Sequence, residues 1–299
     1  MISDKMPKIA VIGDAILDKY IYGDVSRISP EAPIPVVLVT NIEYKPGGAG
    51  NVAANLARLG ADADLFSIVG DDYNKEILRR SLQEFNVNSQ LITDKDRPTI
   101  VKERYIASSQ QLLRVDYELE DHLKSHHIDE IKTKFSRYDS IIISDYAKGM
   151  MSQDIMSFLK TQNIPIFVDP KPKNALLYSD VFFILPNVKE CTSISHVEDD
   201  LDAAKKLRDD LNSNILLTRG SKGMALIKKN DDSIHLLETV AREVTDVTGA
   251  GDTVIATFAF FYSKGYPVTE SAELANKAAG IAVGKMGCYQ VSLDELLND

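Results

Sequence analysis

The stretch Lys8-Ile-Ala-Val-Ile-Gly13-Asp14 decides the fold class, because a short apolar run that ends in Gly and Asp is typical of a buried parallel strand entering its loop. Similar apolar runs recur at residues 63–69, 140–144, 164–169, 181–185 and 214–217. Helical patterns lie between several of them, at residues 51–59, 73–85, 152–161 and 201–211. Strands that alternate with helices of this length predict an α/β fold, with a mainly parallel sheet covered on both faces.

Length and charge exclude several classes of protein. The 299 residues carry 34 Lys and Arg against 44 Asp and Glu, a formal net charge of −10, without a basic run of the kind that nucleic-acid binding needs. The longest apolar run, residues 254–262, is far short of the roughly 20 residues of a membrane-spanning helix. The N-terminal residues 1–17 lack a cleavable leader pattern, so we expect a cytoplasmic protein without nucleic-acid or membrane partners.

Two segments break the alternation of strands and helices. Residues 20–44 and 98–116 read as short extended pieces with turn signals. The first contains Ser26-Arg-Ile-Ser-Pro-Glu-Ala-Pro-Ile-Pro-Val-Val-Leu-Val39, whose three prolines forbid a helix and suit edge strands. We expect these segments to form a small β lid over a cleft.

Acidic residues close three of the predicted strands. Asp14, Asp145 and Asp169 each follow an apolar run. Ligands of open parallel sheets bind beyond the carboxyl ends of the strands, so these residues predict one crevice at that edge.

The strongest local signal is Asp246-Val-Thr-Gly-Ala-Gly-Asp252, which leads directly into an apolar helical pattern. The backbone N–H groups of Gly249, Ala250 and Gly251 can converge on a phosphoryl group there, helped by the positive end of the helix dipole. Asp252 would lie beside that anion hole and could accept a proton from an attacking hydroxyl. The alternative is that Asp252 is an N-cap and the glycines form a tight turn.

A second glycine-rich element, Pro46-Gly-Gly48-Ala-Gly-Asn51, also runs from a loop into an amphipathic helix. Close backbone approach at Gly48 and the amide of Asn51 would suit a polyol hydroxyl. The element is neither a Walker A loop nor a dinucleotide fingerprint. Tight helix packing is the alternative.

A third element, Leu185-Pro-Asn187-Val-Lys-Glu190, follows a predicted strand. Asn187 and Glu190 share a face of a starting helical turn and could together order Mg²⁺ and its waters near nucleotide phosphates. The same pair is also typical of a capping box.

Together and in this order, these elements resemble the ribokinase-like (PfkB) carbohydrate kinases over essentially the whole chain. The resemblance implies a three-layer αβα sandwich in one domain, residues 1–299, and ATP-dependent phosphorylation of a sugar. It implies Asp252 as catalytic base, Gly249–Gly251 as anion hole, and Mg²⁺ held by Glu190 through water, and it leaves a monovalent cation open. The implied ATP-binding residues are Asn187, Lys189, Glu190, Thr218, Gly220 and Asn276.

For the last three of these residues a plainer interpretation also exists. Thr218-Arg-Gly220 can be an ordinary turn, and Asn276 can be a polar residue on a packed helix.

Several N-terminal runs narrow the resemblance to the heptose 7-phosphate kinases of this family. They are Gly13-Asp-Ala-Ile-Leu-Asp18, the proline-containing run from Ser26, Ser144-Asp-Tyr-Ala-Lys-Gly149 and Val168-Asp-Pro-Lys171. This implies phosphorylation of the 1-hydroxyl of D-glycero-D-manno-heptose 7-phosphate, in the synthesis of ADP-heptose and surface polysaccharide precursors. In many such relatives a nucleotidyltransferase domain follows. We expect none in these 299 residues, and therefore a separate nucleotidyltransferase.

A phosphosugar needs cations, and Lys102 and Arg104 lie at strand spacing i, i+2, hence on one face. They could clamp the 7-phosphate, with Lys171 as a third charge or a sugar contact. The alternative is a solvated or salt-bridged strand face.

The resemblance implies further substrate contacts. It makes Asp14 the acceptor of a sugar hydroxyl, and Asp18, four residues on, would help at the lid hinge. Asp145 would face the cleft near the sugar or the transferred phosphoryl group.

The lid sequence also predicts self-association. Ile34, Val36 and Leu38 alternate with Val37 and Val39, so both faces of the strand offer apolar surface, and pairing two lids would bury it in a homodimer. Two rival functions stay open at this stage: a kinase of another sugar phosphate or nucleoside, and a sugar-phosphate sensor without turnover.

Overall fold

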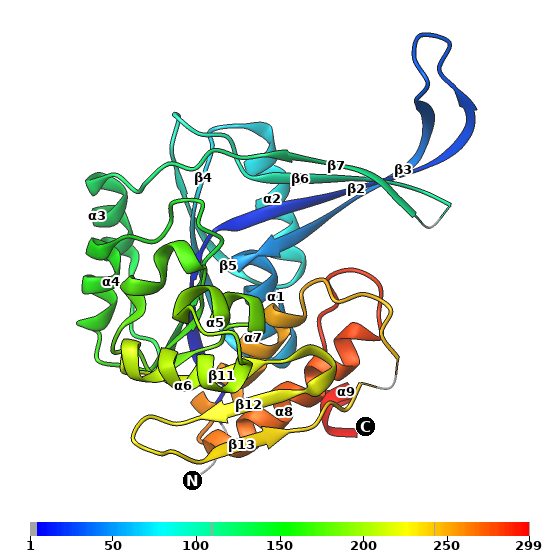
Figure 1. The fold of residues 1–299 in the computed structure, drawn as a ribbon. Coiled ribbons are helices and arrows are strands. Elements are labelled where there is room, and N and C mark those ends of the chain that lie inside the picture. The colour runs from blue at the N-terminus through cyan, green and yellow to red at the C-terminus, as the bar shows by residue number, and fades with distance from the viewer. Residues whose placement is uncertain (1–4, 109, 242, 299) are drawn as a thin grey trace.

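The main sheet of the protein runs through the middle of the molecule. The computed structural model describes residues 5–108, 110–241 and 243–298. Within these residues the main sheet has nine strands in the order β13-β12-β11-β10-β9-β8-β1-β4-β5 (Figure 1). Their bounds are β1 Lys8–Gly13, β4 Asp62–Val69, β5 Asn88–Thr93, β8 Ser140–Ser144, β9 Ile166–Asp169, β10 Phe183–Ile184, β11 Asn214–Thr218, β12 Met224–Ile227 and β13 Ile234–Leu237. The only antiparallel pairings among the described residues are those of β12 with β11 and with β13, near one edge, so the mainly parallel α/β sheet is confirmed.

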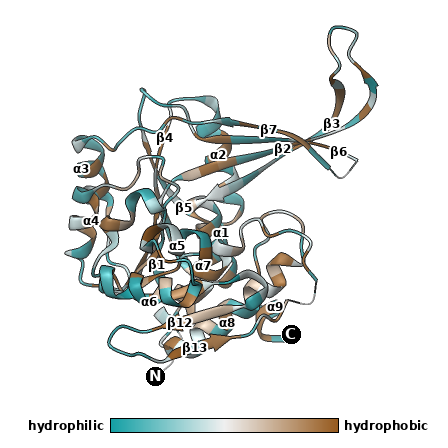
Figure 2. Cartoon of the chain, in the orientation of Figure 1, coloured by the Kyte–Doolittle hydropathy of each residue, from teal (hydrophilic) through white to brown (hydrophobic). Residues whose placement is uncertain are grey.

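Helices cover both faces of this sheet because its strands are apolar on both sides. In β1, Ile9 and Val11 point into one buried cluster, and Ala10 and Ile12 into the other. The first cluster is closed by α1 Ala49–Leu59, α2 Tyr73–Glu84, α7 Ala250–Ser263, α8 Val268–Val283 and α9 Leu293–Asn298. The second is closed by α3 Ser125–Lys134, α4 Gln153–Lys160, α5 Val188–Ser195 and α6 Asp200–Leu211. Figure 2 shows hydrophilic residues on the outer sides of α3, α4 and α6, as a three-layer sandwich requires.

A second sheet, here called the lid sheet, projects from the body (Figure 1). Its four strands lie in the order β3-β2-β6-β7, with bounds β2 Ala15–Ile28, β3 Pro35–Gly48, β6 Val101–Ala107 and β7 Gln110–Tyr117. The strands extend past the predicted segment 20–44, because only Asp14 separates β1 from β2: the Gly13-Asp14 pair, which predicted a loop, marks a direct change from one sheet to the other. Ser109, inside the predicted segment 98–116, lies outside the described residues.

Two glycines let the chain pass between the sheets at close quarters. A Cβ at Gly13 would lie 1.9 Å from the carbonyl oxygen of Ser144. Gly48 has a φ of +56°, and a Cβ there would lie 2.4 Å from the carbonyl oxygen of Asp14. Both positions therefore require glycine.

Among the described residues, no helix is both long enough and apolar enough to cross a membrane.

Candidate active site

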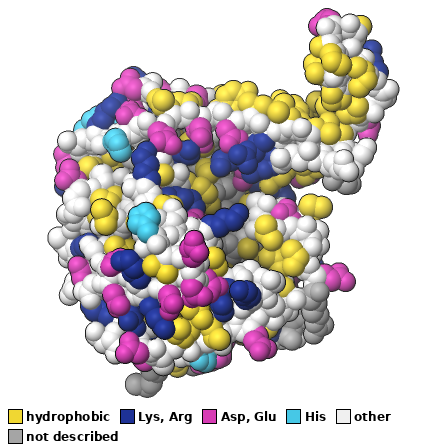
Figure 3. All heavy atoms as spheres, viewed as in Figure 1, with side chains coloured by type: hydrophobic (Ala, Val, Ile, Leu, Met, Phe, Trp, Pro, Cys, Tyr) yellow, Lys and Arg dark blue, Asp and Glu magenta, His cyan; other side chains and the backbone are white. Residues whose placement is uncertain are grey.

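A cavity of about 830 Å³ lies beyond the carboxyl ends of β9, β10 and β11, between them and the start of α7. Predicted site residues that line it are Lys171, Asn187, Lys189, Glu190, Thr218, Gly220, Gly249, Ala250, Gly251, Asp252 and Asn276. In Figure 3, Lys and Arg side chains gather around the hollow between the lid sheet and the body. The predicted crevice thus lies at the carboxyl ends of the parallel strands, as expected for a ligand site of such a sheet.

Asp252 lies in the first turn of α7, where the residue is 4% exposed. Its Oδ2 accepts a hydrogen bond from Asn51 Nδ2 at 2.7 Å, and its Oδ1 accepts one from the Tyr146 hydroxyl at 3.2 Å. Burial raises the pKa of Asp252 to about 6, although both donors favour the ionised form. A carboxyl with this pKa is ionised at neutral pH and is a better proton acceptor than a surface Asp.

The glycine loop before α7 presents free backbone donors. Gly249 is the N-cap, with a φ of +78°, and among the described residues the N–H groups of Gly249 and Gly251 have no hydrogen-bond acceptor. Ala250 departs from the prediction, because its N–H donates to the carbonyl of Val247 at 3.2 Å. A Cβ at Gly251 would meet nothing within 4 Å, so this backbone faces open cavity space, where an anion could approach.

Asn187 and Glu190 form the capping box of α5, the alternative that their spacing left open. Asn187 Oδ1 accepts the N–H of Glu190, and Glu190 Oε2 accepts the N–H of Asn187, both at 3.0 Å. The other carboxylate oxygen of Glu190 forms an ion pair with Lys171. Burial opposes the charge of Lys171, but Asp169 and Glu190 raise its pKa, so it stays cationic inside the cavity.

The predicted nucleotide residues on the far side of the cavity also have local partners. The N–H of Thr218 donates to the carbonyl of Pro186 at 3.0 Å. Gly220 adopts a φ of +58°, and a Cβ there would meet nothing within 4 Å. Asn276, on α8, donates from its side-chain amide to the carbonyl of Glu238 at 2.6 Å. These hydrogen bonds therefore fix the segments that carry Thr218 and Asn276 at this end of the cavity.

The lid sheet contributes a cationic face. Strand register pairs Asp18 of β2 with Lys45 of β3 and with Lys102 of β6, so all three side chains emerge on one side of the sheet. Arg104, two residues further along β6, forms an ion pair with Asp18, which is the salt-bridged alternative for this residue. In the described part of the chain, neither Lys45 nor Lys102 has a carboxylate within 4 Å, so this face carries a surplus of positive charge.

Four predicted substrate residues lie behind the cavity wall. Asp14 accepts the N–H groups of Tyr146, Lys148 and Met150, and Asp145 accepts hydrogen bonds from Ala147, Asn174 and Tyr178. Both carboxylates thus hold the loop that follows β8. Asn51 is fully buried and bonded to Asp252, and Gly48 supports the turn into α1. In this structure these residues shape the site and are not on its surface.

Sequence reasoning missed two residues that face the site: Tyr146 lines the cavity, and Lys45 belongs to the cationic face of the lid sheet. Asp169, which the strand ends predicted to lie at the crevice, also lines the cavity. Burial, reinforced by Glu190 and Asp252 and opposed by Lys171, raises the pKa of Asp169 well above its usual range. The run Ser144-Asp-Tyr-Ala-Lys-Gly149 was the available signal for Tyr146, but nothing in it indicates which side chain faces the cavity.

Residues 6–295 match the model of the pfkB family carbohydrate kinases. The chain belongs to this family. It is a sugar kinase, as the buried carboxylate beside free backbone donors also indicates.

Curated relatives of this pfkB kinase include proteins named "Bifunctional protein HldE". The one from Shewanella amazonensis is 39% identical over 97% of this chain, and the one from Pseudomonas syringae pv. tomato is 42% identical over 98%. The chain spans 63% of the length of each.

Solved structures of other kinases share the fold. Phosphofructokinase-2 from Escherichia coli in complex with potassium superposes with a TM-score of 0.81 at 17% identity, over 98% of both chains. Ribokinase from Arabidopsis thaliana complexed with ribose and ATP gives a TM-score of 0.77 at 19% identity, again over 98% of both chains.

ATP use is expected of a pfkB kinase, and the cavity fits it. Its volume of about 830 Å³ is within the range of small-molecule sites, and its lining combines the free amides of the glycine loop with apolar side chains, among them Val244, Val247 and Val283. For Mg²⁺, the described residues form no cluster of three or more ligands. Asp169 and Glu190 offer carboxylates at the cavity, which suits an ion that keeps most of its waters.

Proposed function

We propose that this pfkB kinase transfers the γ-phosphoryl group of ATP to the 1-hydroxyl of D-glycero-D-manno-heptose 7-phosphate, giving the 1,7-bisphosphate. The proposal rests on the resemblance of its N-terminal runs to heptose 7-phosphate kinases and on relatives named HldE at about 40% identity. The proposed reaction belongs to the synthesis of ADP-heptose and surface polysaccharide precursors. Since its phosphoryl donor is ATP, we propose that the reaction takes place in the cytoplasm.

The observation that carries the choice of a phosphosugar is the cationic face of the lid sheet. Lys45, Lys102 and Arg104 lie around Asp18 on the side of the lid that carries Tyr20. With Arg114 they make four cations against three carboxylates in register on this face, Asp18, Glu43 and Asp116. Lys102 Nζ lies 5.8 Å from the ring centroid of Tyr146, whose hydroxyl reaches Asp252. A neutral sugar would gain little from this charge, whereas a terminal phosphate would bind it strongly.

In the proposed reaction Asp252 takes the proton of the 1-hydroxyl as its oxygen bonds to the γ-phosphorus. The bond between that phosphorus and the bridging oxygen of ADP breaks in the same displacement, and the N–H groups of Gly249 and Gly251 stabilise charge on the transferred group. Mg²⁺, when bound, neutralises charge on the donor phosphates. Glu190 and Asp169 would hold its waters, and Lys171 would be released from Glu190 to contact a phosphate.

The proposed nucleotide contacts occupy the rest of the cavity. Asn187 and Lys189 would flank the phosphates at the start of α5, and Thr218, Gly220 and Asn276 would border the base. The potassium in phosphofructokinase-2 supports extending the proposal to a monovalent cation.

We also propose a homodimer through the lid sheet. Ile28, Ile34 and Leu38 are 60%, 57% and 68% exposed on the projecting β2–β3 hairpin, whose apolar stretches are visible in Figure 2. Apolar surface of this extent on a projecting hairpin favours association with a second copy.

The test is ADP release from ATP and Mg²⁺ with the heptose 7-phosphate, compared with fructose 6-phosphate, ribose and no sugar. Release only with the heptose phosphate, and a product with phosphorus at carbon 1 by ³¹P NMR, is the expected result. Release with another sugar would retain the kinase and reject the substrate. No ADP release with any sugar, from a protein that still binds ATP, would favour a sugar-phosphate sensor without turnover.

A further inference from the structure

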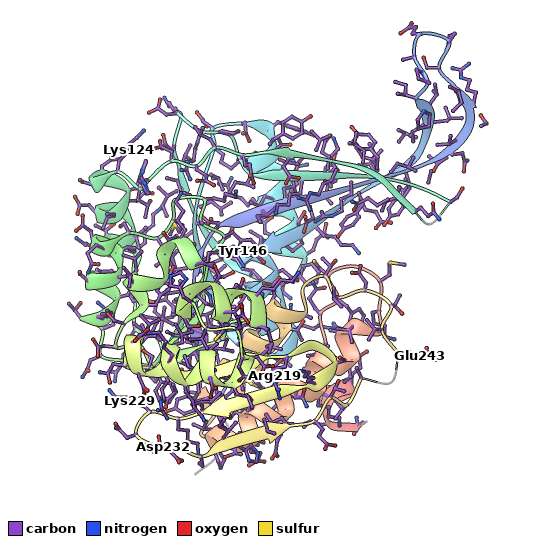
Figure 4. The ribbon with its side chains drawn as sticks, in the orientation of Figure 1. Lys124, Tyr146, Arg219, Lys229, Asp232 and Glu243 are labelled. Carbon is purple, nitrogen blue, oxygen red and sulfur yellow. The ribbon has the colours of Figure 1, made fainter. Side chains whose placement is uncertain are left out.

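Tyr146 connects three parts of the site that come from distant segments of the chain. Its N–H donates to Asp14 Oδ2 at 2.9 Å, and its hydroxyl donates to Asp252 Oδ1 at 3.2 Å. Its ring lies beneath two ammonium groups, Lys102 Nζ at 5.8 Å and Lys171 Nζ at 5.3 Å from the centroid. Figure 4 shows Tyr146 in the region between the lid strands and the helices α5 and α7.

The second donor to Asp252 is held equally firmly. Asn51 Nδ2 reaches Asp252 Oδ2 at 2.7 Å, and Asn51 Oδ1 accepts from Gln290 Nε2 at 2.8 Å and from Asn55 Nδ2 at 3.3 Å. These partners orient the amide so that its NH₂ group faces the carboxylate. Asp252 is therefore fixed through each of its two oxygens, by donors from different elements.

We propose that Tyr146 is a positioning residue for phosphoryl transfer: its hydroxyl holds the carboxylate of Asp252 in the orientation that receives the proton of the attacking sugar hydroxyl. This inference rests on the proposed role of Asp252 as the base. Tyr146 itself keeps its proton, because burial and the negative charges of Asp252 and Asp169 raise its pKa well above the usual value.

The hydroxyl also sets the charge balance around Asp252. The groups that face this carboxylate are Asn51 from α1, Tyr146 after β8, Asp18 from β2, Asp169 from β9, Lys171 after β9, and Cys288 after α8. Burial and Asp18 favour the protonated form, whereas Asn51, Tyr146 and Lys171 favour the ionised form. Removing the hydroxyl of Tyr146 therefore raises the pKa of Asp252.

Two substitutions separate the hydroxyl from the ring. Tyr146→Phe keeps the surface on which Lys102 and Lys171 lie, so we expect kcat to fall about tenfold while KM for the sugar phosphate changes less than about twofold. The acid limb of the kcat profile should move up by about 0.5 to 1 pH unit. Tyr146→Leu removes the ring as well, and should also raise KM for the sugar phosphate.

Tyr138→Phe is the matched control, since Tyr138 is a buried tyrosine whose hydroxyl donates to Asp64 Oδ2 at 2.6 Å, away from the cavity. It should lower stability without moving kcat or the acid limb. A Tyr146→Phe enzyme with the wild-type kcat and acid limb would overturn the proposal.

A second readout does not depend on the sugar. In ligand-free protein labelled with ¹³C-Asp, the signal lost in Asp252→Asn identifies the carboxyl of Asp252, and its titration is followed by NMR. An upward shift of that titration in Tyr146→Phe supports the proposal, and an unchanged one rejects it. If every sugar fails in the kinase assay, this result still decides on Tyr146 while the proposed substrate falls separately.

Discussion

At the scale of single residues, Asp252 joins two opposing requirements in one carboxyl. A proton acceptor at the attacking oxygen must be shielded from water, and burial raises its pKa to about 6. It must also be ionised at working pH, which the donors Asn51 and Tyr146 favour. The structure meets both requirements. Burying the ionised carboxylate costs free energy, and this cost can be measured as a change in the free energy of unfolding.

Asp252→Asn should lower kcat by about 10²- to 10⁴-fold, the usual contribution of a general base. The same substitution should not lower the stability of the fold and should raise it at high pH. The folded-state pKa of about 6 exceeds the reference value of 3.8, so the carboxyl binds its proton more tightly in the folded state, and stability falls as pH rises between these values. At pH 8 this amounts to at most about 3 kcal/mol, which an uncharged Asn avoids.

Urea unfolding at pH 8 and pH 4 checks this expectation. The variant should match or exceed the wild type at pH 8, with a smaller difference at pH 4. A variant clearly less stable than the wild type at pH 8 would contradict it.

Gly249 and Gly251 should respond differently to the same added methyl group. A Cβ at Gly249 would lie 2.7 Å from Asn51 Nδ2, at a φ of +78°, so Gly249→Ala should cost about 1–3 kcal/mol of stability. Gly251→Ala meets only open cavity space and should fold normally while KM for ATP rises. Thermal unfolding and steady-state kinetics on both variants measure this contrast, and equal unfolding temperatures for the two would refute it.

At the scale of elements, the lid sheet owes its character to register. Asp18, Lys45 and Lys102 are register partners on three neighbouring strands, and Lys19, next in sequence, faces the other way and pairs with Glu103 at 2.6 Å. Alternate residues of β2 thus carry two separate sets of charges. The face bearing Lys45 and Lys102 has more cations than anions, whereas the opposite face is balanced at this point.

Lys102→Met should raise KM for a phosphosugar about 10- to 100-fold with little effect on KM for ATP, because it removes one charge from the proposed phosphate clamp. Lys19→Met removes a lysine from the other face of the same sheet and should leave both constants near wild type. Kinetics with each substrate varied in turn compare the two. Equal effects of both substitutions would point to a general charge effect and not to a clamp.

The sequence predicted the elements whose pattern is local. The apolar run of β1 and the helical periods of α1, α2 and α6 appear close to their predicted bounds. Strands β12 and β13 and helix α3 were not predicted, since β12 and β13 have only four residues each and α3 has only two apolar residues, Ile128 and Ile131. For the site, too, local features were predictable and distant contacts were not. The glycine loop before α7 was predicted from its sequence. Asn51 and Asp252 are 201 positions apart and Arg104 and Asp18 are 86 apart, so only the fold reveals these pairs.

At the scale of the whole molecule, the exposed apolar hairpin should decide the oligomeric state. Replacing Leu38 and Ile34 with Asp places charges on side chains that are 68% and 57% exposed, so the fold should survive while a lid-mediated dimer dissociates. Light scattering after gel filtration measures the mass. A wild-type monomer, or a double variant that stays dimeric, would count against this interface.

The direct passage from β1 into β2 through Asp14 has a consequence for engineering. The lid sheet is assembled from two separate stretches, 15–48 and 101–117, and the first continues without a linker into the strand before it and the helix after it. It is therefore not a portable module. A chimera that exchanged substrate preference with another kinase would need both stretches grafted together, and the junctions of the first stretch would fall beside the buried carboxylate of Asp14 and beside Gly48, which tolerates no replacement.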